Sequence, residues 1–510
     1  MANDVVFIKG QGGLGRPLAG EDHISGLLFY SDATLPTGFD SSNRIKQVFS
    51  VSDAEALGIT DTHLGETKAV AKVLIGGTPA IGDTLKVTYT GIEGLETVLD
   101  TYALVSGEET TTTTAAAAYA AQINAGTSTH GFTATNSTAS LLITTKAGEG
   151  VFPNSGTPYA ITVTGANTGT LTQPTGSGST VLGIASDIDI LHYHISEYFR
   201  IQPKGNLYVG IYATAGAAIF SEITTMQDFT VGKLRQIGIY QKTNAFSTAH
   251  LATIQAILTT NYTNHKPLEA IYQANFSAVS DVTTLSDLRA LNAPNVSVCF
   301  GQDGANVGYF LWKATAKSIG CLGTTLGAVS LAKVSEDIAW VGKFNMASTE
   351  YDVLNFANGS VYTSISDGNR DNIDAKGYVF LKKHIGISGS YFSDSHTAVA
   401  LTSDYAYIEN NRTIHKAIRG LRTFLMPQLA SPIVVNEDGS LTDDVIAYYE
   451  TLCARALDVM QRDGELSNFS VVIDPTQDVL STSTLEITVK LQPVGVARQI
   501  EVNVGFAVSI

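Results

Sequence analysis

Charged side chains are scarce in this chain. Only 15% of its 510 residues are Asp, Glu, Lys or Arg, whereas soluble domains usually contain about 25%. A surface with so few charges indicates that partners cover much of it, although a large, well-buried monomer would have the same composition. Basic residues are the scarcer sign, with 31 against 47 acidic residues and a formal net charge of −16. Nucleic acid is therefore not expected as a direct partner, because phosphate binding needs a basic face.

Cysteines are also few, and long hydrophobic runs are missing. Cys299, Cys321 and Cys453 lack the spacing of a disulfide framework or a zinc site, so we expect reduced, buried thiols. No apolar run approaches the ~18 residues that span a bilayer, and membrane insertion is not expected. The start of the sequence, MANDVVFIKG, has no basic segment and no long apolar segment, so no secretory signal is expected.

The composition changes between residues 76 and 179, where Thr, Ala, Gly and Ser dominate. The short alternating runs DTLKVTYTG, ASLLITTKAG and YAITVTGANTG are separated by turn residues, which predicts an inserted all-β domain. The alanine-rich stretch at 115–125 predicts one helix within it. A disordered linker is the alternative for the threonine run at 110–114, but the alternation on both sides favours a folded domain. We expect hinges at Gly76–Gly77 and at 174–179.

Outside this segment strands alternate with helices, which predicts a mixed α/β core whose sheet is flanked by helices. Strands are expected at 235–240, 269–276 and 295–301. Helices are expected at 247–262 and 403–425, where apolar residues step by threes and fours, and at 442–464, where acidic residues begin the segment and a glycine follows it.

The sequence finishes on a pattern of period two. In VARQIEVNVGFAVSI apolar residues alternate with small or polar ones, which predicts a strand with one buried face. The apolar residues are Ile500, Val502, Val504, Phe506, Val508 and Ile510. This strand could complete the sheet begun by LEITVKLQ, with PVGVA as a hairpin turn. Alternatively, Pro493 and Gly495 could form a hinge that gives the strand to a neighbouring molecule.

No group of residues indicates catalysis or a bound cofactor. GQGGLG at 10–15 imitates a dinucleotide fingerprint, but RPLAGEDHISG follows it where the fingerprint needs a helix. A flexible N-terminal arm is therefore the interpretation. Ser395, His396 and Cys321 have no catalytic partner that the sequence places, because a triad is recognised by its geometry.

Two segments imitate metal sites. His192 and His194 would face one side on a strand and could hold a metal there, but their segment predicts a helix, which points them in different directions. DGNRDNID at 367–374 begins like a calcium loop, yet it lacks the turn glycine and the final acidic ligand. We expect a solvated loop there and no metal.

Several long segments resemble one protein family. They are DAEALGI (53–59), ILHYHISEYFRIQPKGNLYVGIY (190–212), EDIAWVGKFN (336–345), the segment 377–422 from GYVFLKKHIG to HKAIRGLR, and the paired terminal strands. Together they resemble the contractile tail sheath proteins of myophages and their relatives in contractile injection systems. The resemblance covers the chain except for residues 76–179, and no short diagnostic motif carries it.

The resemblance implies a structural protein, not an enzyme, with neither cofactor nor active site. Subunits of such a sheath polymerise helically around a tail tube, then contract and drive the tube through the host envelope. The implied partners are further copies of the chain, the tail tube protein, and the baseplate and tail terminator proteins. The implied location is the tail sheath of a virion assembled in the bacterial host cytoplasm.

The resemblance also implies a domain division. We expect an α+β fold with an N-terminal arm at 1–25, a discontinuous core of two subdomains at 26–75 and 180–480, the inserted outer domain at 76–179, and a C-terminal β arm at 481–510. Both arms are expected to exchange strands with neighbouring subunits. Because a helix of the C-terminal domain lies near the lumen in related sheaths, Arg412, Lys416, Arg419 and Arg422 are hypothesised to face an acidic tube; a solvated helix face is the alternative.

Three other functions are compatible with the sequence. Another tail or baseplate structural protein would share the same features. A Rossmann-like nucleotide-binding enzyme would use GQGGLG and the strand–helix alternation. A surface carbohydrate-binding protein is suggested by the β-rich insert alone.

Overall fold

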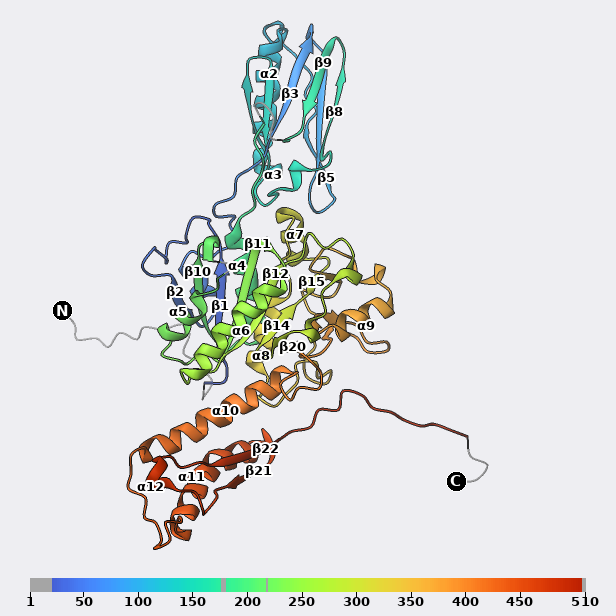
Figure 1. Cartoon of the computed structure of the whole chain (residues 1–510). Helices are drawn as coiled ribbons and strands as arrows, with labels where there is room; N and C mark the ends of the chain where they lie inside the picture. The colour runs from blue at the N-terminus through green and yellow to red at the C-terminus, as the bar shows by residue number, and fades with distance from the viewer. Residues whose placement is uncertain (1–20, 176–179, 217–218, 507–510) are drawn as a thin grey trace, which may run out of the picture.

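The computed structural model describes residues 21–175, 180–216 and 219–506. The chain forms a central α/β body, an elongated lobe at one end of it, and a smaller helical part at the opposite end (Figure 1). Within the described ranges, no helix is long and apolar enough to cross a membrane.

A seven-stranded sheet in the order β17-β14-β12-β11-β1-β10-β2 forms the centre of the body. All neighbouring strands run parallel except β2, which is antiparallel to β10 at the edge. A parallel sheet needs both faces covered, which fits its apolar strands. The strands are β1 (Ile24–Tyr30), β2 (Ile45–Val48), β10 (Asn206–Tyr212), β11 (Gln236–Ala245), β12 (Glu269–Asn275), β14 (Val296–Cys299) and β17 (Tyr378–Val379).

Side chains of β1 alternate between two hydrophobic cores, one on each face of the sheet. Leu27 and Phe29 lie in the core that includes α4 (Asp187–Ile201) and α8 (Leu322–Leu331). Leu28 and Tyr30 lie in the core that includes α5 (Glu222–Phe229) and α6 (Thr248–Thr263). A Cβ on Gly323 of α8 would lie 2.2 Å from the carbonyl oxygen of His194 on α4, so these two helices pack backbone to backbone.

The remaining short elements of the body surround the sheet. They are α1 (Val51–Ala56), β13 (Asn292–Ala293), β15 (Gly301–Asp303), α7 (Val307–Thr315), β16 (Leu354–Phe356), α9 (Asp367–Ala375), β18 (Leu381–Lys382), β19 (Tyr391–Phe392) and β20 (Ala398–Val399). The loop predicted at 367–374 is wrong, because this segment is α9. The Ser366 side chain accepts a hydrogen bond from the Asn369 amide, and Asp367 in the first turn complements the helix dipole.

The lobe contains two antiparallel sheets, β6-β7-β3-β9 and β5-β4-β8, around a core of its own. It is not all-β, because α2 (Thr112–Ala125) buries Ala116, Tyr119 and Ile123 in that core. The helix predicted at 115–125 is thereby confirmed. The strands are β3 (Val70–Gly77), β4 (Thr84–Thr90), β5 (Glu96–Asp100), β6 (Thr133–Ser137), β7 (Ser140–Thr144), β8 (Tyr159–Thr164) and β9 (Asn167–Thr172), and the short helix α3 (Thr127–His130) follows α2.

The two chain segments that enter and leave the lobe lie side by side. Val70 forms an antiparallel bridge with Val181, and Thr67 forms one with Ile184. The boundary expected at residue 76 falls inside β3, which starts six residues earlier and is a central strand of its sheet. The division of the chain into separately folding domains stays a prediction.

The helical part at the other end of the body contains α10 (Ile408–Leu425), α11 (Asp443–Arg462), α12 (Val479–Thr482) and the antiparallel pair β21 (Leu466–Val472) and β22 (Thr488–Pro493). Both long helices were predicted from the sequence and are confirmed, as are the helix α6 and the strands β11, β12 and β14. Leu457 and Met460 of α11 pack with Ala417 of α10 and Leu466 of β21. GQGGLG at 10–15 lies outside the described residues.

We predict that the body folds without the lobe. Residues 70–181 can be replaced by a short Gly/Ser linker, because antiparallel bridged residues lie only about 5 Å apart and Val70 and Val181 form such a bridge. The variant should remain soluble and unfold cooperatively on heating, as followed by circular dichroism. An insoluble variant, or one without a cooperative transition, would show that the lobe is part of the core of the body.

Candidate functional site

The chain after β22 carries an exposed row of apolar side chains. The exposed fraction is 80% for Ile500, 74% for Val502, 90% for Val504 and 111% for Phe506. This segment runs away from the helical part as an extended chain (Figure 1). Contiguous apolar surface of this kind marks an interaction site. Val508 and Ile510, which continue the pattern in the sequence, lie outside the described residues.

The row has no strand partner in its own subunit. Residues 494–506 form no strand, and β22, which contains most of LEITVKLQ, pairs with β21 instead. The hairpin that the sequence allowed, with PVGVA as its turn, is therefore not formed by the described residues. Exchange of the strand with another subunit stays a prediction, because a single chain does not test it.

The pair β21–β22 has two open edges. Its register runs from Leu466 opposite Pro493 to Val472 opposite Thr488, and no third strand joins it within the described part of the chain. Each strand therefore leaves one row of amide and carbonyl groups without a strand partner. Such an edge accepts an extended chain from another molecule by strand addition.

Arg498 holds the start of this C-terminal segment against the body. Its Nη2 lies 3.0 Å from Asp337 Oδ2 and 2.5 Å from Glu409 Oε1, and its Nε lies 3.0 Å from Asp394 Oδ2. The guanidinium also lies 3.5 Å from the centroid of the Tyr407 ring. One planar cation thus binds three carboxylates and an aromatic face, an arrangement that suits arginine better than lysine.

The three carboxylates around Arg498 influence each other's ionisation. Burial, and then the negative charges of Glu409 and Asp394, raise the pKa of Asp337 to about 7. Burial alone would lower the pKa of Arg498, but Asp394, Glu409 and Asp337 outweigh it and raise that pKa. The site is therefore rich in negative charge, and the Arg498 guanidinium compensates part of that charge.

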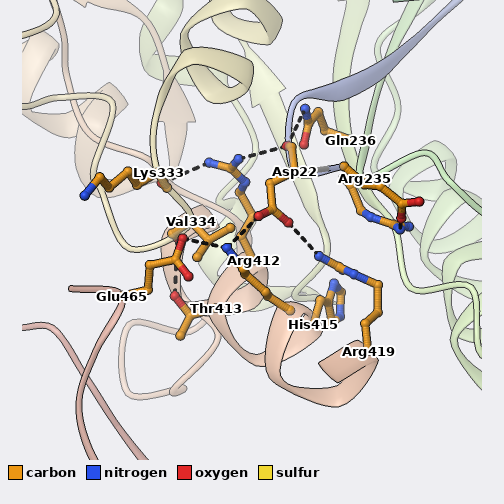
Figure 2. A network of polar contacts seen from close by, with 12 residues as sticks. Asp22, Arg235, Gln236, Lys333, Val334, Arg412, Thr413, His415, Arg419 and Glu465 are labelled. Carbon is orange, nitrogen blue, oxygen red and sulfur yellow. Dashed lines mark hydrogen bonds and ion pairs between the residues drawn. The ribbon is translucent and has the colours of Figure 1, made fainter. Parts of the chain in front are cut away.

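A second charged network lies further along α10, and Figure 2 shows it in close view. Asp22, which lies two residues before the start of β1, accepts from Lys416 Nζ at 2.7 Å and from Arg419 Nη2 at 2.9 Å. Arg412 donates to the main-chain oxygen of Asp22 at 3.3 Å. Lys416 also pairs with Glu465 at 2.7 Å. Burial opposes ionisation of Asp22, but the nearby Lys416, Arg419 and Arg412 lower its pKa overall.

This network changes the interpretation of the four basic residues of α10. Arg412 is buried, and Arg412, Lys416 and Arg419 all bind groups of their own chain. Their charges are therefore at least partly compensated within the chain, and their contact with a tube stays a prediction. Arg422 is exposed, and no ion pair of it occurs among the described residues. Contact of this helix with an acidic tube is not tested by the single chain.

The other candidate residues have structural surroundings. His192 lies 3.3 Å from Glu55, whereas His194 is buried beside Tyr240 and has its pKa lowered to about 3 by burial. The two histidines point apart on α4, as predicted. Cys299, Cys321 and Cys453 are free and buried, as the sequence predicted. Across the described ranges, no group of three His, Cys, Asp or Glu side chains could hold a metal ion.

Ser395 and His396 do not form a catalytic pair. The Ser395 hydroxyl donates to Glu409 at 2.5 Å, within the acidic site of Arg498. His396 lies between Arg289 and Asp374, 2.5 Å and 3.0 Å from their nearest side-chain atoms. Neighbouring positions in the sequence therefore serve different networks.

A cavity of about 580 Å³ lies where the lobe meets the body. Main-chain amides bind two of its carboxylates: Glu66 accepts from Gly148 and Gly150, and Glu350 accepts from Val307 and Gly308 at the start of α7. Burial, and then Asp303, raise the pKa of Glu350 to about 7. These contacts join the lobe to the body and order a helix start.

The raised pKa of Asp337 predicts a pH dependence of stability. Between about pH 4 and pH 7 the folded chain holds a proton on this carboxyl that the unfolded chain has lost, since the ordinary pKa is about 3.9. The protonated Asp337 carboxyl thus adds to the free energy of unfolding at low pH, and this contribution is lost as the pH rises through 7. Asp337→Asn removes the titration, so the melting temperature of the natural chain should fall relative to the variant by about 2 °C from pH 5 to pH 8.

Differential scanning fluorimetry at pH 5, 6, 7 and 8 measures this difference. Asp352→Asn is the matched control, because Asp352 is exposed and its nearest cation, Lys383, lies 3.6 Å away. The control should show no relative change. A constant difference between the natural chain and Asp337→Asn across the pH range would contradict the assignment.

Comparison with known proteins places the whole chain in one family. The model "DUF2586, N-terminal domain" matches residues 2–396, and the model "DUF2586, C-terminal domain" matches residues 404–510. The two matches meet just before α10. No match was found among curated proteins.

Among solved structures, the chain is similar to sheath proteins of contractile systems. The helical sheath of the anti-feeding prophage in its contracted state matches with 16% identity, 61% of this chain, 81% of that chain and a TM-score of 0.44. The contracted PVC sheath of an extracellular contractile injection system matches with 14% identity, 62% and 80% coverage and a TM-score of 0.42. A sheath tail protein from Listeria innocua matches with 9% identity, 94% and 97% coverage and a TM-score of 0.37.

The two family matches cover the body, the lobe, α10 and the C-terminal segment, and the chain belongs to the DUF2586 family.

Proposed function

We propose that this chain is the sheath subunit of a contractile tail or injection system. It polymerises helically around a tail tube and contracts to drive the tube through a cell envelope. The observation that carries the proposal is the exposed apolar row from Ile500 to Phe506, in a subunit whose β21–β22 pair has two open edges. The sequence resemblance to tail sheath proteins supports the same function.

Strand addition between subunits accounts for both features at once. A strand from Ile500 to Ile510 would extend about 35 Å, and pairing it with the open edge of a neighbouring β21–β22 sheet would supply main-chain hydrogen bonds. The donating and accepting surfaces are different parts of the chain. An interface of this heterologous kind, if its rotation does not close a ring, builds an open helical filament.

The same design suits a single contraction. The extended sheath is a kinetically trapped state that relaxes once, so the movement needs no nucleotide hydrolysis. Subunits rotate as rigid bodies while the exchanged strands keep them linked. The lobe lies at the opposite end of the subunit from the C-terminal part (Figure 1), which suits an outer domain on a sheath whose C-terminal part lies near the tube.

The proposed partners follow from this function. They are further copies of the chain, the tail tube protein, and the baseplate and terminator proteins at the two ends of the sheath. The assembly would form in the bacterial cytoplasm and belong to the particle. Of the four basic residues of α10, Arg422 alone has a charge that is free to meet an acidic tube.

Truncation of the row tests the proposal. A chain that ends after Gln499 keeps Arg498 and its contacts, so it should fold with the melting temperature of the intact chain. Negative-stain electron microscopy should show long hollow tubes of the intact chain and none of the truncated chain, because the donated strand is missing. Closed rings from the intact chain would favour a baseplate component instead, and tubes from the truncated chain would contradict the proposal.

Point substitutions test whether assembly depends on which face of the strand carries an added charge. Val504→Asp and Phe506→Asp should each reproduce the assembly defect, because the buried face of a paired strand does not accept a carboxylate. Asn503→Asp introduces the same charge on the opposite face and is the matched control, which should still assemble. Equal behaviour of Val504→Asp and Asn503→Asp would show that side-chain burial is not what the row provides.

A further inference from the structure

One stripe of α10 binds the chain at both ends of the described structure. Glu409, Arg412, Lys416 and Arg419 follow one another at spacings of three, four and three residues, which places them on one face of the helix. The first contacts Arg498 near the C-terminus, and the other three contact Asp22 near the N-terminus. Contacts separated by up to 397 residues in the sequence therefore meet on a single helix.

The two contacts are opposite in charge. At the N-terminal end a carboxylate enters a basic site, where Asp22 lies between Lys416 and Arg419. At the C-terminal end a guanidinium enters an acidic site made by Asp337, Asp394 and Glu409. Asp22 lies beside the first strand of the central sheet, and Arg498 lies five residues after β22. Each residue thus lies close to one end of the described chain.

Close packing does not hold the C-terminal segment in place. Residues 494–498 border a hollow of about 750 Å³ together with Trp340, Lys382 and His384 of the body. The main-chain amides of these residues make no hydrogen bond to other main-chain groups in the described structure. The side chain of Arg498, with its three carboxylates and the Tyr407 ring, is therefore the principal contact of this segment.

We propose that the stripe Glu409–Arg412–Lys416–Arg419 of α10 anchors the chain near both ends of the described structure. Asp22 and Arg498 are the two residues that bind to it. Glu409 and Arg419 are ten residues apart, so the two anchors are separated by about 15 Å along the helix axis. A helix is rigid over this length. The stripe therefore fixes the positions of Asp22 and Arg498 relative to one another and to the body.

This inference gives the proposed sheath function a mechanical part, and for that consequence it rests on the proposed function. During rearrangement of subunits, a pull on an exchanged strand would reach the body through Arg498 and not through the thin β21–β22 pair. The anchors themselves are properties of one folded chain. They are measurable in the dilute, unassembled protein, so their failure is distinguishable from a failure of assembly.

Arg498→Gln tests the C-terminal anchor. Nitroxide labels on Gln499→Cys and Thr451→Cys report the distance between the segment and α11 by pulsed electron paramagnetic resonance, and the three natural cysteines are buried. In the parent chain the distance distribution should be narrow, and Arg498→Gln should broaden it about threefold, as expected for a released flexible segment. Arg498→Lys keeps the charge without the planar fork and should give an intermediate width. Arg462→Gln is the control, because Arg462 is exposed and pairs only with its neighbour Asp463.

Asp22→Asn tests the N-terminal anchor by amide hydrogen exchange. The amide of Ile24 donates to the Glu21 carbonyl at 3.0 Å, and Asp22→Asn should speed its exchange about tenfold by local opening. The strands of the sheet should keep their protection. Asp228→Asn, which removes an exposed pair with Lys266, should leave Ile24 unchanged. An unchanged label distribution in Arg498→Gln, or unchanged exchange at Ile24 in Asp22→Asn, would overturn the proposal.

Discussion

Ile500, Val502, Val504 and Phe506 expose apolar side chains that their own subunit does not cover. Burying such a side chain stabilises a complex by about 1.5–3 kcal/mol, and an extended backbone adds hydrogen bonds when it joins a sheet edge. In the proposed assembly, covering this row would therefore supply much of the free energy of association. Every other feature that we assign to assembly depends on this row being covered by another molecule.

The body, the lobe and the C-terminal part of the structure differ in how they are built. The doubly covered parallel sheet, with one hydrophobic core on each face, provides a rigid body. The lobe has its own core, and the two chain segments that enter and leave it lie side by side. At the other end, α10 joins the body to the β21–β22 pair and binds residues from both chain ends. In the proposed sheath, association, contraction and the properties of the outer surface would thus depend on different parts of the chain.

Local patterns in the sequence predicted most of the elements. The alanine-rich stretch became α2, the stepped apolar residues became α6 and α10, and the final period-two pattern predicted an apolar row that the structure leaves exposed. The helix predictions succeeded because each depends on neighbouring residues alone. The strand expected from the final pattern is not formed by residues 494–506 of the single chain, and its exchange with another subunit stays a prediction.

Contacts with distant partners could not be predicted from the sequence. Three basic residues of α10 were expected on an open face, but their partners Asp22 and Glu465 lie far away in the sequence, and no pattern along the helix reveals them. The lobe boundary was placed at Gly76–Gly77 because paired glycines suggest a hinge. In the structure both glycines pair with β9 as the last residues of β3. The loop expected at 367–374 is wrong for a local reason, because the cap at Ser366 starts a helix there.

Cross-linking between distinguishable subunits measures the central claim most directly. One subunit carries Val504→Cys in the row, and a second subunit, lengthened by an affinity tag, carries Ser470→Cys on β21. The two are assembled together and treated with a short bis-maleimide. The natural cysteines are buried, so they should contribute only a low background of cross-linking. Strand exchange predicts a covalent product that contains one subunit of each length. A single chain that carries both cysteine substitutions provides the opposite test. If it cross-links only within itself, the account is contradicted, because the row would then be covered by its own subunit.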